Sequence, residues 1–133
     1  ASGFLVLFNP KNNNGNNSQM LAESIVNEQS TMQKNGNGYQ QRYNLGVLNM
    51  FQGNASVLIE VGFISNSGDV LLMTQNAEQI GKEIAIGVFK YLYGTEPETD
   101  YQNLDISPQK FILEQITLPK DNLDLKNNPM GGW

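Results

Sequence analysis

Short apolar runs alternate with polar, turn-forming stretches along the first two thirds of the chain. Residues 3–8 (GFLVLF) form a continuous apolar run before an Asn-Pro pair, which predicts a buried strand ending in a turn. Residues 11–17 (KNNNGNN) predict a polar loop, and Ser18 is a suitable N-cap for a helix that runs to about residue 32. The core-facing side of that helix consists of Leu21, Ile25, Val26 and Met32.

A second strand region begins after a polar stretch. Residues 33–41 are rich in Gly, Asn and Gln and predict a loop, which leads to a short apolar segment at residues 45–51 (LGVLNMF). Residues 55–63 (ASVLIEVGF) are rich in β-branched side chains and predict a strand buried on both faces. One carboxylate, Glu60, interrupts this apolar strand.

The clearest helix follows a short apolar turn at residues 70–73. Asn76 is its predicted N-cap, Gln79 occupies the capping-box position, and Gly94 closes it. Its predicted core face consists of Ile80, Ile84, Val88, Tyr91 and Leu92. The order strand, helix, strand, strand, helix predicts an α/β fold with a mostly parallel sheet flanked by helices.

The composition changes after the last predicted helix. Residues 95–100 have the acidic, Pro-containing character of a linker, and residues 111–118 (FILEQITL) form an apolar segment between two prolines. The remaining residues carry too little apolar content for a core of their own. We therefore predict a domain over residues 1–94, and an acidic linker with an extended C-terminal arm over residues 95–133.

Charge and composition exclude several classes of function. A formal net charge of -5 argues against nucleic-acid binding, which needs clustered Lys and Arg. The sequence contains no run of about eighteen apolar residues to span a membrane, and its start does not resemble a signal peptide. His and Cys are both absent, so carboxylates and carbonyls remain as metal ligands, and these suit calcium or magnesium better than zinc.

Glu60 is the candidate for chemistry because a carboxylate within an apolar strand needs compensation. One interpretation places it at the end of its strand, partly solvated and without a function. The other places it at the C-terminal edge of a parallel sheet, where open α/β folds build their sites. Apolar surroundings would there raise its pKa and suit it to general acid or base catalysis.

Residues 56–66 (SVLIEVGFISN) closely resemble the signature strand and turn of the zinc-dependent N-acetylmuramoyl-L-alanine amidases of the amidase 3 type. The flanking segments agree with that family: a strand like residues 3–8, a Ser-Gln-x-Leu-Ala helix start at residues 18–22, and the Val47-Leu48 pair. The resemblance extends over about residues 2–93. It implies the C-terminal half of an amidase-like, three-layer catalytic domain that is incomplete at its N-terminus.

The resemblance also implies a reaction and a role for Glu60. Family members cut the amide between the lactyl group of N-acetylmuramic acid and the first L-alanine of the peptidoglycan stem peptide. Their Zn²⁺ is held by two His and one Glu, and a further Glu, matched here by Glu60, assists the attack of water and protonates the leaving amine. The Zn²⁺ ligands are not present in this chain, so we expect activity only together with a missing N-terminal, metal-binding half.

Two further residues are candidates for substrate binding. The family tends to carry an Arg before its Val-Leu segment, where this sequence has Gly38 by direct alignment and Arg42 only after a shift. Arg42 is either a substrate contact or an ordinary solvated Arg. Asn66, with Ser67 beside it, either shapes the cleft or is a plain turn residue.

Other side chains allow less specific interpretations. The carboxylates of Asp69, Glu60 and Asp100 suggest a calcium site, but their spacing in the sequence matches no known calcium-binding loop. Tyr91 and Tyr93 are either packing residues or a platform for a sugar.

Two functions follow from the sequence. The first is a peptidoglycan hydrolase of cell-wall lysis or remodelling, such as a phage lysin, located outside the cell, in the envelope or in a virion. The second is a non-catalytic structural or interaction module derived from an amidase, for example in a phage tail or virion assembly, with its arm added to a neighbour's sheet. Because a half-domain would leave apolar surface uncovered, we expect the isolated chain to be insoluble or oligomeric.

Overall fold

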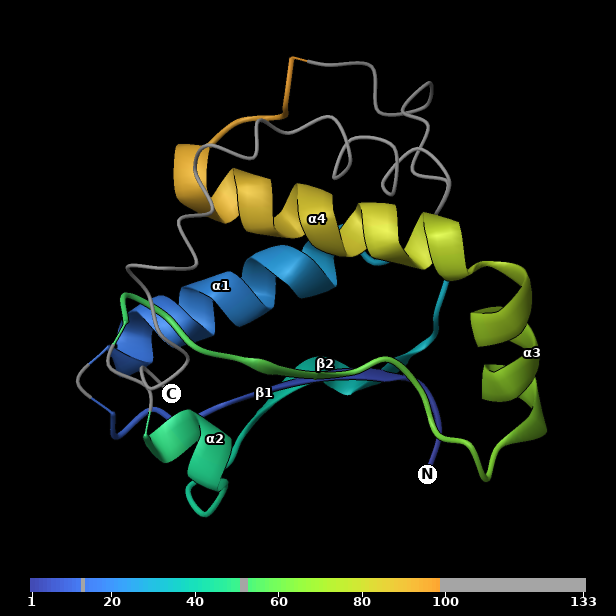
Figure 1. The fold of residues 1–133 in the computed structure, drawn as a ribbon, viewed down its shortest axis with the longest axis horizontal. Helices are drawn as coiled ribbons and strands as arrows, with labels where there is room; N and C mark the ends of the chain where they lie inside the picture. Colours follow the sequence, from blue (N-terminus) through green and yellow to red (C-terminus); the bar gives the residue numbers. More distant parts are fainter. Residues whose placement is uncertain (13, 51–52, 99–133) are drawn as a thin grey trace, which may run out of the picture. The chain divides into compact units, whose positions relative to one another are not determined.

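A computed structural model describes residues 1–12, 14–50 and 53–98 (Figure 1). The predicted α/β class is confirmed. The predicted arm lies, from residue 99 onward, outside the described residues. The elements in chain order are β1 (Phe4–Phe8), α1 (Gly15–Glu28), β2 (Lys34–Gln41), α2 (Gly46–Asn49), β3 (Leu58–Glu60), α3 (Ser67–Gln75) and α4 (Ala77–Tyr93).

The three described strands form one mixed sheet in the order β2-β1-β3. β2 runs parallel to β1, and β3 runs antiparallel to it, with Leu5 opposite Glu60 and Leu7 opposite Leu58. The prediction of a mostly parallel sheet is therefore confirmed for the β1–β2 pair and wrong for the β1–β3 pair.

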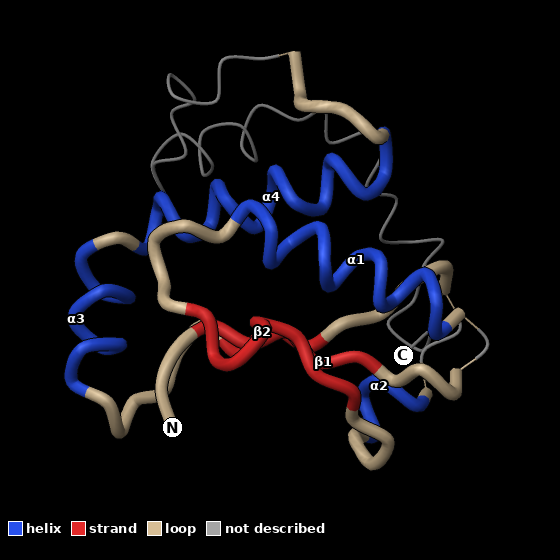
Figure 2. The backbone as a smooth tube through the Cα atoms, turned by 180° about the vertical axis from the view of Figure 1, so that it is seen from behind, coloured by secondary structure: helices blue, strands red, loops and turns tan. Residues whose placement is uncertain are grey.

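The five residues of β1 are all buried, as the continuous apolar run predicts, because both faces of this central strand are covered. Phe4, Val6 and Phe8 belong to the main core, with Ile25 of α1 and Ile80 of α4. Leu5 and Leu7 form a second, smaller cluster with Leu48 of α2. Figures 1 and 2 show the same division from opposite sides: α1 and α4 cover one face of the sheet, and α2 lies against the other.

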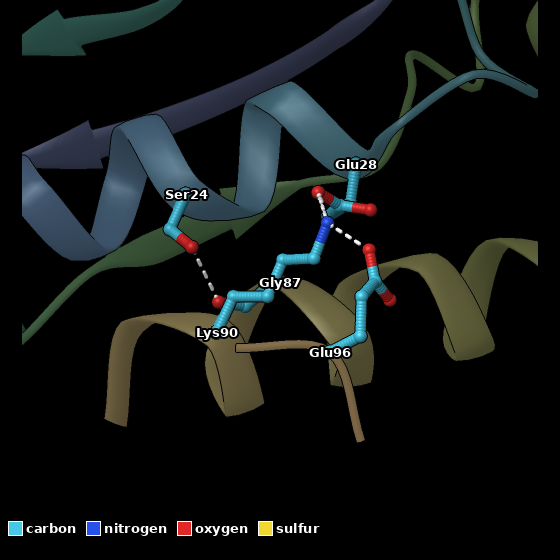
Figure 3. Close-up of polar contacts among 5 residues, drawn as sticks. All are labelled: Ser24, Glu28, Gly87, Lys90 and Glu96. Carbon is cyan, nitrogen blue, oxygen red and sulfur yellow. Dashed lines mark hydrogen bonds and ion pairs between the residues drawn. The ribbon is translucent and has the colours of Figure 1, made fainter. Parts of the chain in front are cut away.

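The contact between α1 and α4 combines apolar packing with polar links (Figure 3). The Ser24 hydroxyl donates a hydrogen bond of 2.6 Å to the carbonyl of Gly87. The Lys90 ammonium pairs with the carboxylates of Glu28 and Glu96, and these hydrogen bonds raise the pKa of Lys90. The Ser24–Gly87 and Glu28–Lys90 contacts connect α1 with α4, whereas Glu96 follows α4 in the chain.

The predicted core face of α4 is confirmed for Ile80, Ile84 and Val88 but wrong for Leu92, which is 60% exposed. At 3.6 residues per turn, each step of four residues advances the side chain by about 40° beyond a full turn. Three such steps turn Leu92 about 120° away from Ile80. Gly94 ends the helix as predicted, with a left-handed φ of 71°.

β2 occupies most of the stretch predicted to be a loop. Phe4 pairs with Lys34, but Val6 pairs with Tyr39, so two residues along β1 correspond to five along β2. The three extra residues of β2 form a bulge, and this irregular backbone explains why the stretch has the composition of a loop. Gly38, within this bulge, has a φ of 83°, and a Cβ there would lie 2.5 Å from Val26 Cγ1. A larger residue at Gly38, including the Arg that the resemblance implies there, would therefore be strained and would require Val26 to move.

Other predicted boundaries shift by several residues. The apolar segment at residues 45–51 contains the short helix α2, the apolar turn at 70–73 lies within α3, and β3 spans three residues of the predicted strand at 55–63. Asn14, and not Ser18, occupies the N-cap position of α1, and its side chain makes no capping hydrogen bond there. Ser18 is buried inside the helix, where its hydroxyl accepts a hydrogen bond of 3.0 Å from Ser56 N–H.

None of the helices in the described ranges is both long and apolar enough to cross a bilayer.

Candidate functional site around Glu60

Glu60 is the last residue of β3 and lies at the end of the sheet where β1 begins. Directly opposed residues of an antiparallel pair point to the same side of the sheet. Because Leu5, the partner of Glu60, packs toward Leu48, Glu60 projects from the α2 face, away from α1 and α4. Glu60 is half-buried, so part of the residue remains in contact with solvent.

The expected position at the C-terminal edge of a parallel sheet is wrong for this strand. β3 runs antiparallel to β1, so the C-terminal end of β3 meets the start of β1 instead of its end. The simpler interpretation, a carboxylate at the end of its own strand and partly solvated, describes where Glu60 lies. Among the described residues, its carboxylate has no hydrogen bond or ion pair with another side chain.

The turn after Glu60 is held by the carboxylate of Asp69, in the first turn of α3. One oxygen of Asp69 accepts hydrogen bonds from two backbone N–H groups, Gly3 at 2.7 Å and Phe63 at 2.9 Å. Asp69 is 6% exposed, and its negative charge also lies near the positive N-terminal end of α3. The strand that begins the sheet is thereby tied to the turn that follows Glu60.

Asn66 takes the position of a helix cap. Its side-chain oxygen accepts a hydrogen bond of 3.0 Å from Asp69 N–H, which satisfies one of the donors left unpaired at the start of α3. This contact is the one expected of a turn residue. It leaves the substrate-binding role of Asn66 a prediction.

Arg42 lies at the other end of the sheet from Glu60. Its backbone N–H donates a hydrogen bond of 2.8 Å to Phe8 O, beyond the last residue of β2, whereas Glu60 lies opposite Leu5. At about 3.3 Å per residue, these two points of β1 are about 10 Å apart along the strand, and Glu60 and Arg42 flank β1 on opposite sides. The structure does not bring Arg42 and Glu60 together, and Arg42 is exposed.

The residues of this chain do not fit the zinc site that the resemblance implies. The sequence has no His or Cys, and the described residues contain no group of three Asp or Glu placed to hold a metal ion. The Asp69 carboxylate, considered above for calcium, is occupied by two backbone N–H groups, and Asp100 lies outside the described residues. The described part of the chain therefore assembles no metal site by itself.

The tyrosines near the end of α4 each make one contact with another side chain. The Tyr91 hydroxyl donates a hydrogen bond of 2.6 Å to the side-chain oxygen of Asn54. Tyr93 is 67% exposed, with its ring centroid 4.6 Å from that of Phe89. Neither contact distinguishes a sugar platform from helix packing.

The comparison with protein families decides the lineage. Residues 1–90, about two thirds of the chain, match the family model described as N-acetylmuramoyl-L-alanine amidase. The chain belongs to this amidase family. No curated protein gives a significant match. The family places the chain among amidase-type hydrolases that act on peptidoglycan, and the matched range includes Glu60, Asn66 and Asp69.

Asp69 is the residue beside the turn after Glu60 whose structural role the sequence does not reveal. The sequence shows it three residues after Asn66, the spacing between an N-cap and the N3 position of a helix. That spacing predicts a contact between the two residues. It does not predict the bond to Gly3, which is 66 residues away.

Proposed function

We propose that this chain supplies the Glu60-bearing part of a peptidoglycan amidase that cuts between N-acetylmuramic acid and the L-alanine of the stem peptide. The observation that carries the proposal is the position of Glu60 within the family match: half-buried at the end of β3, on the face away from α1 and α4. A carboxylate there can reach a polymer without opening the main core.

Glu60 has one task in this reaction, the movement of a proton. Hydrolysis forms a bond from the water oxygen to the amide carbon and breaks the bond from that carbon to nitrogen. A carboxylate takes the proton from the attacking water and then gives it to the departing nitrogen, so the products are a carboxylic acid on the lactyl group and a free amine on alanine. One residue can act as base and then as acid because it is regenerated at the end.

Replacement of Glu60 by Gln tests this role, because Gln keeps the shape and removes the basic oxygen. In the native protein that carries this chain, Glu60→Gln should lower hydrolysis of a muramoyl-peptide by about 10²- to 10⁴-fold, the usual size of general acid–base catalysis. Glu78→Gln is the matched control, since the Glu78 side chain is 64% exposed on α4. Hydrolysis that survives Glu60→Gln unchanged would rule out the proposed role.

The chain needs partners for this activity. We propose that Zn²⁺ is held by His and Glu residues outside this sequence, and that the 133-residue chain alone is inactive. The substrate, peptidoglycan, lies outside the cytoplasmic membrane, so we also propose an extracellular, cell-envelope or virion location. Elemental analysis of the native protein should find about one zinc per copy of this chain.

The alternative is a non-catalytic module that keeps the amidase fold within a larger assembly, such as a phage tail. The observation that favours it is the lack of His and Cys together with the lack of a metal-holding cluster in the described residues. Native protein without zinc and without hydrolytic activity would support this alternative against the enzyme.

A further inference from the structure

The Leu5–Glu60 pair is the last pairing that β3 makes with β1, and the chain direction changes after it. Two residues further along each strand, the ladder would bring Gly3 opposite Gly62. Instead, the Asp69 carboxylate accepts hydrogen bonds from Gly3 N–H and Phe63 N–H and so joins the two strands beyond Glu60. In Figure 1 the N-terminus of the chain lies beside the loop that leads from β3 to α3.

The space around the Asp69 carboxylate, where it joins Gly3 to Phe63, is closely filled. A Cβ placed on Gly62 would lie 3.2 Å from Asp69 Cβ and 3.1 Å from both Met32 Cε and Met73 Sδ. Asp69 is itself fixed at its backbone by the bond from its N–H to Asn66. The carboxylate therefore has little freedom to leave the two N–H groups.

The direction of the Glu60 side chain depends on the hydrogen bonds that Asp69 accepts from Gly3 and Phe63, because β3 is short. A strand of three residues has few ladder bonds, and the end of a ladder opens more readily than its middle. Phe63 N–H is held by Asp69 three residues after Glu60. Loss of that hold frees the Leu5–Glu60 pair to open and lets the Glu60 carboxylate change direction.

We propose that Asp69 is the positioning residue for Glu60: it binds Gly3 and Phe63 at once and thereby fixes the backbone from which the Glu60 carboxylate projects. This inference rests on the proposed function of Glu60. It assigns to Asp69 no contact with the substrate.

The test compares Asp69→Ala and Asp69→Asn in the native protein that carries this chain. Asp69→Ala removes both acceptor bonds and should lower kcat by about 100-fold with KM within about 2-fold, because a displacement of about 1 Å at a catalytic group costs about that much. Asp69→Asn keeps one neutral acceptor oxygen, which should limit the loss in kcat to about 3- to 10-fold. Amide hydrogen exchange at Gly3 and Phe63 should be at least about 10-fold faster in Asp69→Ala than in the wild type.

Glu83→Gln is the control for a purely structural effect. Glu83 is also a buried carboxylate that binds backbone N–H groups, those of Ser30 and Thr31. Within the described residues, none of its hydrogen bonds goes to the turn after Glu60. It should lower stability and leave kcat unchanged at a temperature where each variant is fully folded. Equal kcat losses in Asp69→Asn and Glu83→Gln, or wild-type kcat in the folded Asp69 variants, would overturn the positioning role.

The two proposals fail in different ways. If Glu60→Gln hydrolyses the substrate as fast as the wild type, the proposed function fails whatever the Asp69 variants do. If Glu60→Gln is inactive and Asp69→Ala keeps its kcat, only the inference about Asp69 fails. Should Asp69→Ala not fold, Asp69→Asn carries the test, with an expected loss in kcat of about 3- to 10-fold and faster exchange at Phe63.

Discussion

Gly87 of α4 lies directly against Ile25 of α1: a Cβ built on Gly87 would be 2.5 Å from Ile25 Cα and 3.0 Å from Ser24 O. Both of these atoms belong to the backbone of α1, so a side chain cannot rotate away to make room. The two helices approach this closely only because position 87 carries no side chain.

Gly87→Ala should therefore destabilise the domain, although Ala favours a helix more than Gly does. Overpacking of a close contact costs about 1–3 kcal/mol, and a clash with backbone atoms belongs to the upper part of that range, above the gain in helix propensity of about 1 kcal/mol. Gly81 is the matched control in the same helix, because nothing lies within 4 Å of a Cβ built there. Gly81→Ala should stabilise the domain by about 0.5–1 kcal/mol in urea unfolding. Equal effects at the two sites would contradict the close approach of α1 and α4.

The lowered pKa of Glu83 predicts how the free energy of unfolding depends on pH. Burial alone would raise its pKa, but hydrogen bonds from Ser30, Gln79 and Thr31 outweigh that effect and lower the pKa from its ordinary value. A lowered folded-state pKa means that the unfolded chain binds a proton more readily. The stabilisation is therefore complete above the ordinary glutamate pKa of 4.5 and is lost as the pH falls through the lower folded value.

Glu83→Gln should cost about 1.5–3 kcal/mol near neutral pH, because hydrogen bonds to a charged acceptor are replaced by weaker ones. The variant should also lose less stability than the wild type on acidification below that range. Urea unfolding at several pH values measures both effects. Glu78→Gln, on the exposed side of α4, should follow the wild type, and a Glu83→Gln curve parallel to the wild type would refute the link to its pKa.

The bulge in β2 gives a further test of the fold. Gly36 and Gly38 both have left-handed φ values, 57° and 83°, but only a Cβ at Gly38 meets another residue, Val26 Cγ1 at 2.5 Å. Asn tolerates the left-handed region better than most residues. Gly36→Asn should change the free energy of unfolding by less than about 1 kcal/mol, whereas Gly38→Asn should cost at least about 2 kcal/mol. Similar losses in the free energy of unfolding at both positions would show that the left-handed φ, and not the contact with Val26, sets the cost of the substitution.

The sequence by itself determined the elements whose signals are local. The apolar run at residues 3–8 predicted a buried strand, and Gly94 ended α4 because its missing Cβ allows a left-handed φ. The stretch at residues 56–66 carried the amidase family, which the match over residues 1–90 confirms. Each of these signals depends on a few neighbouring residues.

Tertiary structure decided the rest. The polar stretch that became β2 is a strand because buried β1 needs a hydrogen-bonding partner along its edge, and the direction of β3 places Glu60 at the start of β1. The role of Asp69 arises from a bond to Gly3, 66 residues earlier in the chain. Local composition does not encode such contacts, because strand pairing and burial depend on which distant segments meet when the chain collapses around its core.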